Sequence, residues 1–217
     1  MNKAIIGKKL GMTQIFFDSA EDKKNRGKVI PVTVVQAGPC PVVQVKTVEK
    51  DGYSSVKVAF QKVSEKELNK PELGQFKKAG LEPHKYLKEF RLENAAEYGV
   101  GKVITVETFA AGDKVDVVGI TKGHGFSGVI KRWNQHRLKE THGVGPVHRE
   151  VGSMSANSSP SRVFKNKHLA GQYGHEQVTI QNLEIVRVDA ARNVLLIKGA
   201  IPGPKGGIVC ISNSVKG

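Results

Sequence analysis

Short runs of β-branched and aromatic residues, separated by glycine, proline and polar turns, make up both ends of the chain. Runs of this length and composition are typical of β-strands. Closely spaced strands with few helices favour a barrel or a sandwich, so the sequence predicts a mainly β fold. The predicted strands are residues 4–6, 12–17, 29–36, 42–48, 56–60, 102–108, 115–120, 177–188, 193–197 and 207–212.

Turn residues punctuate these runs. We expect hairpins or barrel corners at Gly7, at the polar residues 18–27, at the Gly-Pro-Cys-Pro break of residues 38–41, and at Asp51-Gly52. Glycine and proline at such places supply the backbone angles that tight turns require.

Residues 61–101 differ in composition from these runs, because they are mostly polar and carry charges of both signs. Ser64 and Glu67 have the spacing of a capping box, and Pro71 with Gly80 can bracket a second short helix. We therefore expect a helical or irregular insertion between strands of the barrel.

Residues 121–168 break the strand pattern. They hold nine Lys/Arg against two acids, which gives 9 − 2 = +7, half of the chain's net charge of +14. Five of the seven histidines and the only tryptophan, Trp133, also lie here. With few clustered aliphatic residues the segment has no means of burying its own core, so we expect it to stay extended unless a polyanion neutralises it. Phosphate groups suit Lys, Arg, His and backbone N–H donors best.

The predicted domain organisation follows from this contrast. Strands before and after the basic segment need each other to close a core. We therefore expect residues 1–120 and 169–217 to form one β-barrel domain, with the 61–101 insertion within it. Residues 121–168 would be a long basic loop, of a length that is improbable unless it is functional.

The hydrophobic runs and the two cysteines indicate in which cellular compartment the protein is expected. No apolar run approaches the roughly 20 residues that span a bilayer, and the first residues lack the apolar run of a signal peptide. We expect a soluble, cytoplasmic protein with no membrane partner. A disulfide between Cys40 and Cys210 is possible, but two reduced core thiols are the preferred interpretation.

Two motifs of the basic segment resemble cofactor sites. Residues 123–128 match G-x-G-x-x-G, but a dinucleotide-binding turn must open an amphipathic helix that leads to a parallel strand, and basic coil follows instead. His136, His142 and His148 recur every six residues, which is not the spacing of a helical zinc pair. We expect no cofactor, no metal, no catalytic residue and no small-molecule substrate.

Two features of the basic segment remain open. Trp133 could be a platform for base stacking or a local packing anchor. Residues 152–160 are small and uncharged, and could be the turn-back tip of a two-armed loop or a plain linker. The predicted tip residues are Gly152, Ser153, Met154, Ser155, Ala156, Asn157, Ser158, Ser159 and Pro160.

The predicted nucleic-acid contacts are the cations, histidines, glycines and tryptophan of the basic segment. The alternative is a solvent-exposed charged surface without a binding role, but such surfaces usually carry both positive and negative side chains. The contact residues are Lys122, Gly123, His124, Gly125, Lys131, Arg132, Trp133, His136, Arg137, Lys139, His142, His148, Arg149, Arg162, Lys165 and Lys167.

Several blocks in order along the chain are similar to the bacterial form of the large-subunit ribosomal protein three family. These blocks are residues 7–16, 34–40, 121–128, 131–133, 162–165, 169–171, 178–183 and 198–203.

The resemblance implies a six-stranded translation-factor-like barrel near the subunit surface, with a long loop driven into large-subunit rRNA. It also implies binding early in assembly, contacts with neighbouring ribosomal proteins, and a tip at 152–160 that approaches the peptidyl transferase centre without doing its chemistry. Some family members carry a methylated glutamine there, where this chain has Ala156, Asn157 and Ser158.

The function expected from these observations is that of a structural, RNA-binding constituent of the large ribosomal subunit. The alternatives are an RNA chaperone or nucleic-acid-binding module outside the ribosome, and a dinucleotide-dependent enzyme that uses residues 123–128.

Overall fold

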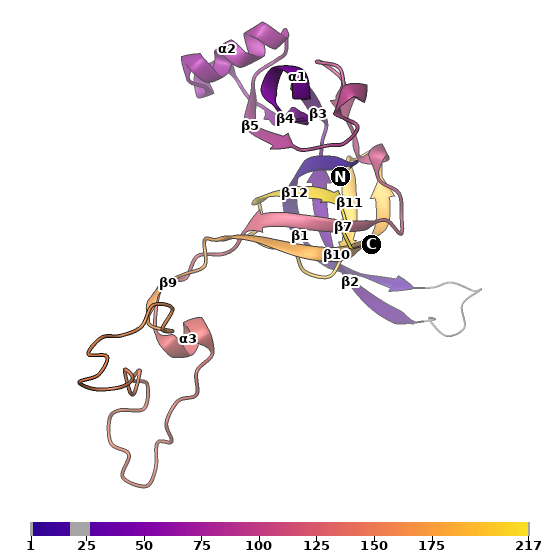
Figure 1. The fold of residues 1–217 in the computed structure, drawn as a ribbon. Helices are drawn as coiled ribbons and strands as arrows, with labels where there is room; N and C mark the ends of the chain where they lie inside the picture. Colours follow the sequence, from indigo (N-terminus) through magenta and orange to yellow (C-terminus); the bar gives the residue numbers. More distant parts are fainter. Residues whose placement is uncertain (1, 18–26, 217) are drawn as a thin grey trace. The chain divides into compact units, whose positions relative to one another are not determined.

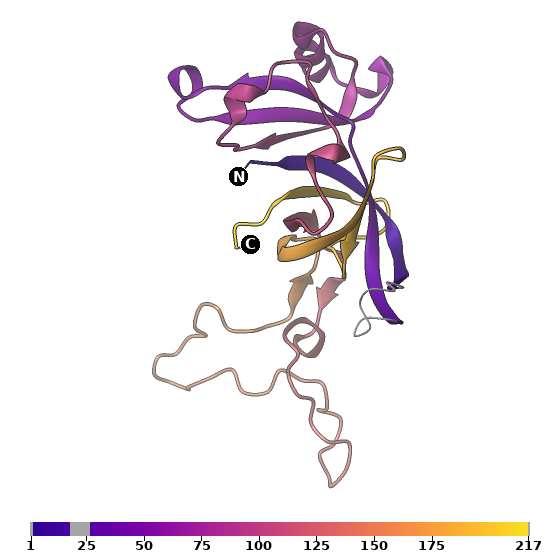
Figure 2. The same cartoon turned by 90° about the vertical axis from the view of Figure 1, so that its right-hand side faces the viewer.

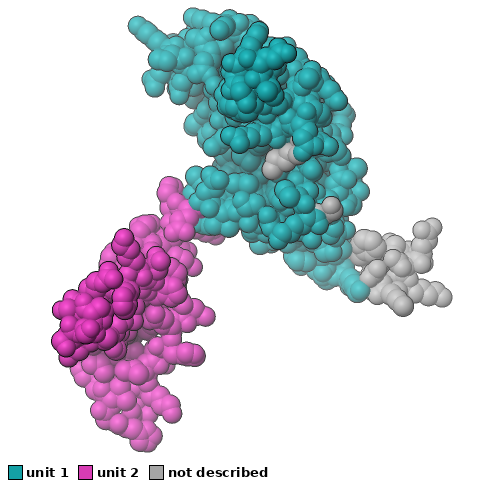
Figure 3. Space-filling model, in the orientation of Figure 1, with its two compact units in different colours: residues 1–121, 177–217 teal, residues 122–176 magenta. Residues whose placement is uncertain are grey.

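The computed structural model of the protein describes residues 2–17 and 27–216 (Figure 1). The polar turn expected at 18–27 lies outside the described residues except for Gly27. The chain divides into two compact units, coloured separately in Figure 3. We call residues 1–121 with 177–217 the barrel unit and residues 122–176 the arm unit.

Six antiparallel strands close the barrel in the order β1-β12-β7-β10-β11-β2 (Figure 1). Closure pairs β2 with β1, so neither strand is left as a free edge. The mainly β fold with a six-stranded barrel is thus confirmed. The strands are β1 (Ala4–Phe17), β2 (Lys28–Ala37), β7 (Lys114–Ile120), β10 (Gln177–Asp189), β11 (Val194–Lys198) and β12 (Ile208–Asn213).

The expected corner at Gly7 was wrong. Gly7 lies inside β1, and a Cβ there would come within 2.6 Å of Val35 Cγ1, so the glycine permits close strand packing rather than a turn. The irregularity of β1 comes slightly later, where a bulge between Lys9 and Gly11 shifts the register against β2.

A second, four-stranded sheet has the order β5-β4-β3-β6 and is drawn in purple to magenta in Figure 2. It uses the runs at 42–48 and 56–60, which therefore do not belong to the barrel. Its strands are β3 (Cys40–Lys46), β4 (Ser55–Lys62), β5 (His84–Phe90) and β6 (Val103–Ile104).

Two predictions in this region need correction. Residues 61–101 are not only helical or irregular, because they contain β5. Residues 102–108 form a strand only at Val103–Ile104, followed by the 3-10 turn η3 (Val106–Thr108).

The helical signals of the insertion are confirmed. The carboxylate of Glu67 accepts the backbone N–H of Ser64 at the start of η1 (Glu65–Glu67). Helix α2 (Lys70–Ala79) has Pro71 in its first turn and ends at Gly80, whose φ of 66° is left-handed. The remaining short elements are α1 (Val48–Asp51) and η2 (Ala95–Glu97).

One hydrophobic core joins the barrel to the second sheet. Ile5 and Ile6 of β1 are both fully buried and belong to the same cluster as Val56 and Phe60 of β4. Consecutive buried residues mean that both faces of this part of β1 are covered. A smaller cluster places Phe76 of α2 on the second sheet, and burying a side chain of this size stabilises the fold by about 1.5–3 kcal/mol.

The side chain of Lys9 is buried in the barrel unit together with its hydrogen-bond partners. Lys9 is 8% exposed, and its Nζ donates to the carbonyls of Ile201 and Gly203 at 2.8 and 2.9 Å. Cys40 and Cys210 are free thiols. Burial raises the pKa of both thiols, that of Cys40 to about 12, which suits the expected reduced core thiols.

Among the described residues no helix is long and apolar enough to cross a membrane.

Candidate nucleic-acid interface

The base of the arm unit is a two-stranded antiparallel ribbon. Strand β8 (Gly125–Ser127) pairs with β9 (Gly171–Tyr173), and helix α3 (Val129–Trp133) follows β8 directly. The residues between α3 and β9 form no further helix or strand. The ribbon therefore anchors both ends of a long irregular segment.

A cluster of four residues, which we call the clasp, joins the outgoing chain to the returning one. The Trp133 indole N–H and the Arg132 guanidinium both donate to the carbonyl of Leu169, each at 2.9 Å. The Trp133 ring stacks on His168, with centroids 4.0 Å apart and planes 7° apart. Of the two roles left open for Trp133, the structure shows local packing.

Glycines let the ribbon and the clasp come close. A Cβ on Gly171 would lie 2.5 Å from Nη1 of Arg132. Gly174 has a φ of 73°, and a Cβ there would lie 2.1 Å from the carbonyl oxygen of Lys122. A side chain at Gly174 would push the two chain segments apart, and one at Gly171 would displace the Arg132 guanidinium.

The irregular segment turns back twice. The backbone N–H of Leu138 donates to the carbonyl of His148 at 3.2 Å, which closes a first loop over residues 139–147. Gly152 and Met154 then line a hollow with Gly128 and Ala170 of the base. A second loop thus runs from Met154 to the clasp, where the sequence suggested a single turn at 152–160. Residues 152–160 are all exposed.

The charge of the arm unit is largely uncompensated. Among residues 122–168, all of them described, the one ion pair joins Arg137 to Glu140, and Arg132 is engaged in the clasp. Lysines of the barrel unit, in contrast, include Lys3 and Lys46, which pair with acids. Seven arm cations are exposed and have no carboxylate partner: Lys122, Lys131, Lys139, Arg149, Arg162, Lys165 and Lys167. Such a concentration of one sign attracts an anionic partner.

The structure separates the predicted contact residues into groups. The clasp holds Arg132 and Trp133, and His124 stacks on Tyr173 of the ribbon with centroids 5.0 Å apart. His136 and His142 are exposed, and no group of three metal-ligating side chains occurs among the described residues.

The glycine-rich motif at 123–128 does not have the surroundings of a dinucleotide site. Its strand, β8, pairs antiparallel with β9, and α3 has only five residues. A nucleotide-binding turn needs a parallel strand and a helix long enough to direct its N-terminus at the phosphates.

Sequence reasoning missed three residues of this unit. Leu169 supplies the carbonyl of the clasp, and Gly171 provides the room for Arg132; their partners are distant in sequence, so no local signal marks them. Phe126 is 81% exposed. An aromatic residue in a strand flanked by glycines was a signal that could have marked it.

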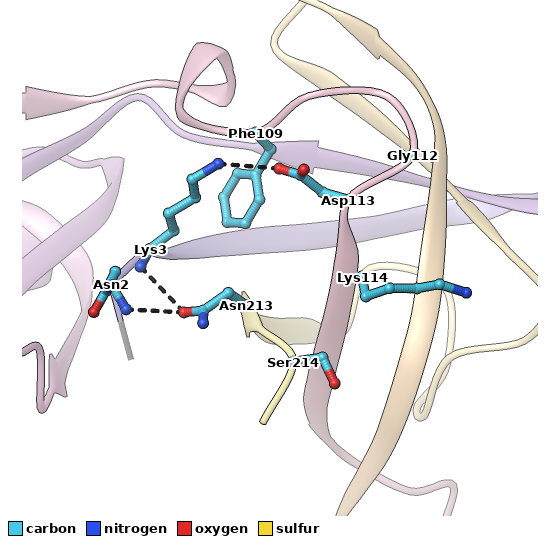
Figure 4. A pocket seen from close by; sticks show the side chains of 8 residues that line it. All are labelled: Asn2, Lys3, Phe109, Gly112, Asp113, Lys114, Asn213 and Ser214. Atoms are coloured by element: carbon cyan, nitrogen blue, oxygen red, sulfur yellow. Dashed lines mark hydrogen bonds and ion pairs between the residues drawn. The ribbon is translucent and has the colours of Figure 1, made fainter. Parts of the chain in front are cut away.

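The barrel unit has a hollow of its own, shown in Figure 4. Two of its charged side chains form an ion pair, in which Lys3 Nζ lies 3.1 Å from Asp113 Oδ2, and Asn213 Oδ1 accepts the backbone N–H of Lys3. The backbone N–H of Ala110 and then the Lys3 ammonium hold the pKa of Asp113 below its ordinary value. Lys114 points away from this pair (Figure 4). The acid and the base that face each other in this hollow, Asp113 and Lys3, are thus bound to one another.

The unpaired cations of the arm unit are typical of a protein that binds a polyanion. The sequence model of a family described as ribosomal protein L3 matches residues 87–194, about half of the chain. The match contains β7, the whole arm unit and β10. The chain belongs to the ribosomal protein L3 family, a family of structural proteins of the large ribosomal subunit and not of enzymes.

Proposed function

We propose that the protein binds large-subunit rRNA through its arm unit and uses the barrel unit as a rigid base. The observation that carries this proposal is the set of seven exposed arm cations without a carboxylate partner. Each cation that meets a phosphate releases condensed counterions from the RNA, which is the main source of affinity in such complexes.

The arm gains order from its partner. Residues 134–167 contain no helix or strand and hold few backbone hydrogen bonds, among them those at Leu138 and Ser161. A segment without its own core is ordered at an entropic cost that the phosphate contacts offset. The clasp fixes where this segment leaves and rejoins the ribbon, so it directs the arm into the RNA.

The finer roles rest on family membership together with the surface of the arm. We propose that the protein joins the rRNA early in subunit assembly and contacts neighbouring ribosomal proteins. We also propose that residues 152–160, which are exposed and uncharged, face the peptidyl transferase centre. Small neutral side chains can enter a crowded RNA site that long cationic side chains do not fit.

A footprint on rRNA tests the proposal. Ile120 and Gln177 are directly paired in the ladder of β7 and β10, so an Asn-Gly hairpin turn can replace residues 121–176 without opening the barrel. Hydroxyl-radical cleavage of large-subunit rRNA should show a long protected path with the full chain, and the armless variant should lose most of it. An unchanged footprint, with the variant folded by circular dichroism, would contradict the proposal.

Sedimentation of a cell extract separates this function from that of an RNA chaperone outside the ribosome. The full chain should travel with large subunits. A chain found mainly in the free-protein fractions would favour the chaperone.

A further inference from the structure

The two faces of the β8–β9 ribbon are unlike. Ser127 and Gly171 are paired and share one face, where Ser127 is 5% exposed and Arg132 of the clasp lies against Gly171. Phe126 and Gln172 are paired on the opposite face, because neighbouring residues of a strand point to opposite sides. Phe126 is 81% exposed, and Gln172 is also exposed. The clasp therefore covers one face and leaves the other bare.

The bare face combines an aromatic ring with an amide. A phenyl ring that is 81% exposed gains little from the rest of the chain. The Gln172 amide makes only a long 3.4 Å bond to the carbonyl of Tyr173, so it can rearrange to donate and accept elsewhere. A planar partner with polar edges fits this pair of side chains.

The charge around the ribbon selects the kind of planar partner. Lys122 precedes β8 and Lys131 lies in α3, and both are exposed without a carboxylate partner. Residues 122–139 contain no acid. An apolar side chain of another protein would not use these cations, whereas a nucleotide brings a phosphate together with its base.

We propose that Phe126 and Gln172 form a base-binding face: an unpaired rRNA base stacks on the Phe126 ring, and its edge bonds to the Gln172 amide. Single-stranded bases bind proteins in this way, by stacking on aromatic side chains and by hydrogen bonds to their edges. This inference rests on the proposed rRNA binding of the arm and adds a base-contacting site, separate from the phosphate contacts of the cations.

Affinity of the full chain for large-subunit rRNA is the first test. Phe126→Ala should weaken binding roughly 5- to 100-fold, the effect of losing one stacked base. Phe126→Trp should keep the wild-type affinity. Phe126→Leu should lose affinity, because leucine keeps apolar area but has no aromatic face on which a base can stack. The matched control is Phe16→Ala, since Phe16 is a 64% exposed phenyl on a strand of the barrel unit. Equal affinities for Phe126→Ala and the wild type would overturn the proposal.

Chemical probing of the same complexes is the second test. With Phe126→Ala, one or a few bases within the arm footprint should become reactive to dimethyl sulfate or kethoxal, while the hydroxyl-radical footprint of the backbone stays. Unchanged base reactivity inside an intact footprint would overturn the base-binding face alone. If the wild-type chain itself gave no footprint that depends on the arm unit, the proposed function would be overturned instead.

Discussion

The indole of Trp133 lies flat on the imidazole of His168, with ring centroids 4.0 Å apart and an interplanar angle of 7°. The Trp133 N–H and the Arg132 guanidinium meet on one carbonyl, that of Leu169. The two ends of the long irregular segment are thus held together by aromatic stacking and two hydrogen bonds. Since Trp133 is the only tryptophan, its fluorescence reports on this clasp.

Gly171→Ala should loosen the clasp. The new methyl would meet Nη1 of Arg132 at 2.5 Å, so the guanidinium must move away from the Leu169 carbonyl, at a cost of about 1 kcal/mol. Quenching of Trp133 fluorescence by acrylamide should increase. Gly128→Ala is the control, because a Cβ there meets nothing within 4 Å. Equal quenching in the two variants would mean that Arg132 is not held as described.

Lys9→Met should destabilise the barrel unit. The substitution leaves the carbonyls of Ile201 and Gly203 without the donor that bonds them at 2.8 and 2.9 Å. The expected loss is roughly 2 kcal/mol of unfolding free energy, measured by urea denaturation. Lys8→Met removes the neighbouring, partly exposed lysine and should change stability by less than about 0.5 kcal/mol. Similar losses for both variants would contradict the role of Lys9.

Glu89 should titrate far below an ordinary glutamate. Its hydrogen bond with Lys46, followed by that with Tyr53, lowers its pKa from 4.5 to about 2. Because the folded pKa is depressed, the stabilisation is fully present above about pH 4.5 and is lost as the pH falls toward 2. NMR titration of the Glu89 carboxyl group checks the value. Lys46→Met should raise the pKa of Glu89 toward 4.5, whereas the control Lys62→Met, on the neighbouring strand, should leave it unchanged. A Glu89 carboxyl group that titrates near 4.5 in the wild type would contradict its hydrogen bond with Lys46.

Shortening the second loop should separate RNA binding from ribosome function. Replacing residues 155–159 with Gly-Gly removes no charge and spares Met154, which lines the hollow at the base. Affinity for rRNA should stay within about twofold, because phosphate contacts dominate it. Large subunits reconstituted with this variant should form peptide bonds more slowly. Wild-type rates in such subunits would count against a position of this loop near the catalytic centre.

Strand positions could be predicted from local composition, but sheet membership could not. Runs such as 29–36 and 115–120 became β2 and β7 because β-branched residues suit strands wherever these are placed. The runs at 42–48 and 56–60 have the same composition, yet they form a second sheet. Which strands pair is decided by contacts between residues far apart in sequence. Strand β5 was missed because its sequence, HKYLKEF, is polar and mostly half-buried or exposed.

The basic character of the arm could be predicted from composition, but its internal contacts could not. A run of nine cations and two acids is visible in the sequence. That Arg132 bonds a carbonyl instead of remaining free, and that Leu169 and Gly171 complete the clasp, depends on chain segments that meet only after folding. The burial of Lys9 was unpredictable for the same reason.

The central claim, that arm cations bind rRNA phosphates, is tested most directly by the salt dependence of binding. A variant should carry glutamine at four arm cations that have no carboxylate partner and lie outside the clasp: Lys131, Lys139, Arg149 and Lys165. The matched control carries glutamine at four exposed lysines of the barrel unit: Lys50, Lys66, Lys70 and Lys88.

We predict that the arm variant flattens the slope of log K against log salt by about 3, because each phosphate that a cation neutralises contributes roughly 0.7–0.9 to this slope. The barrel control should keep the wild-type slope, and both variants should unfold at the wild-type temperature within a few degrees. An arm variant with the wild-type slope, or two variants with equal changes, would contradict the account.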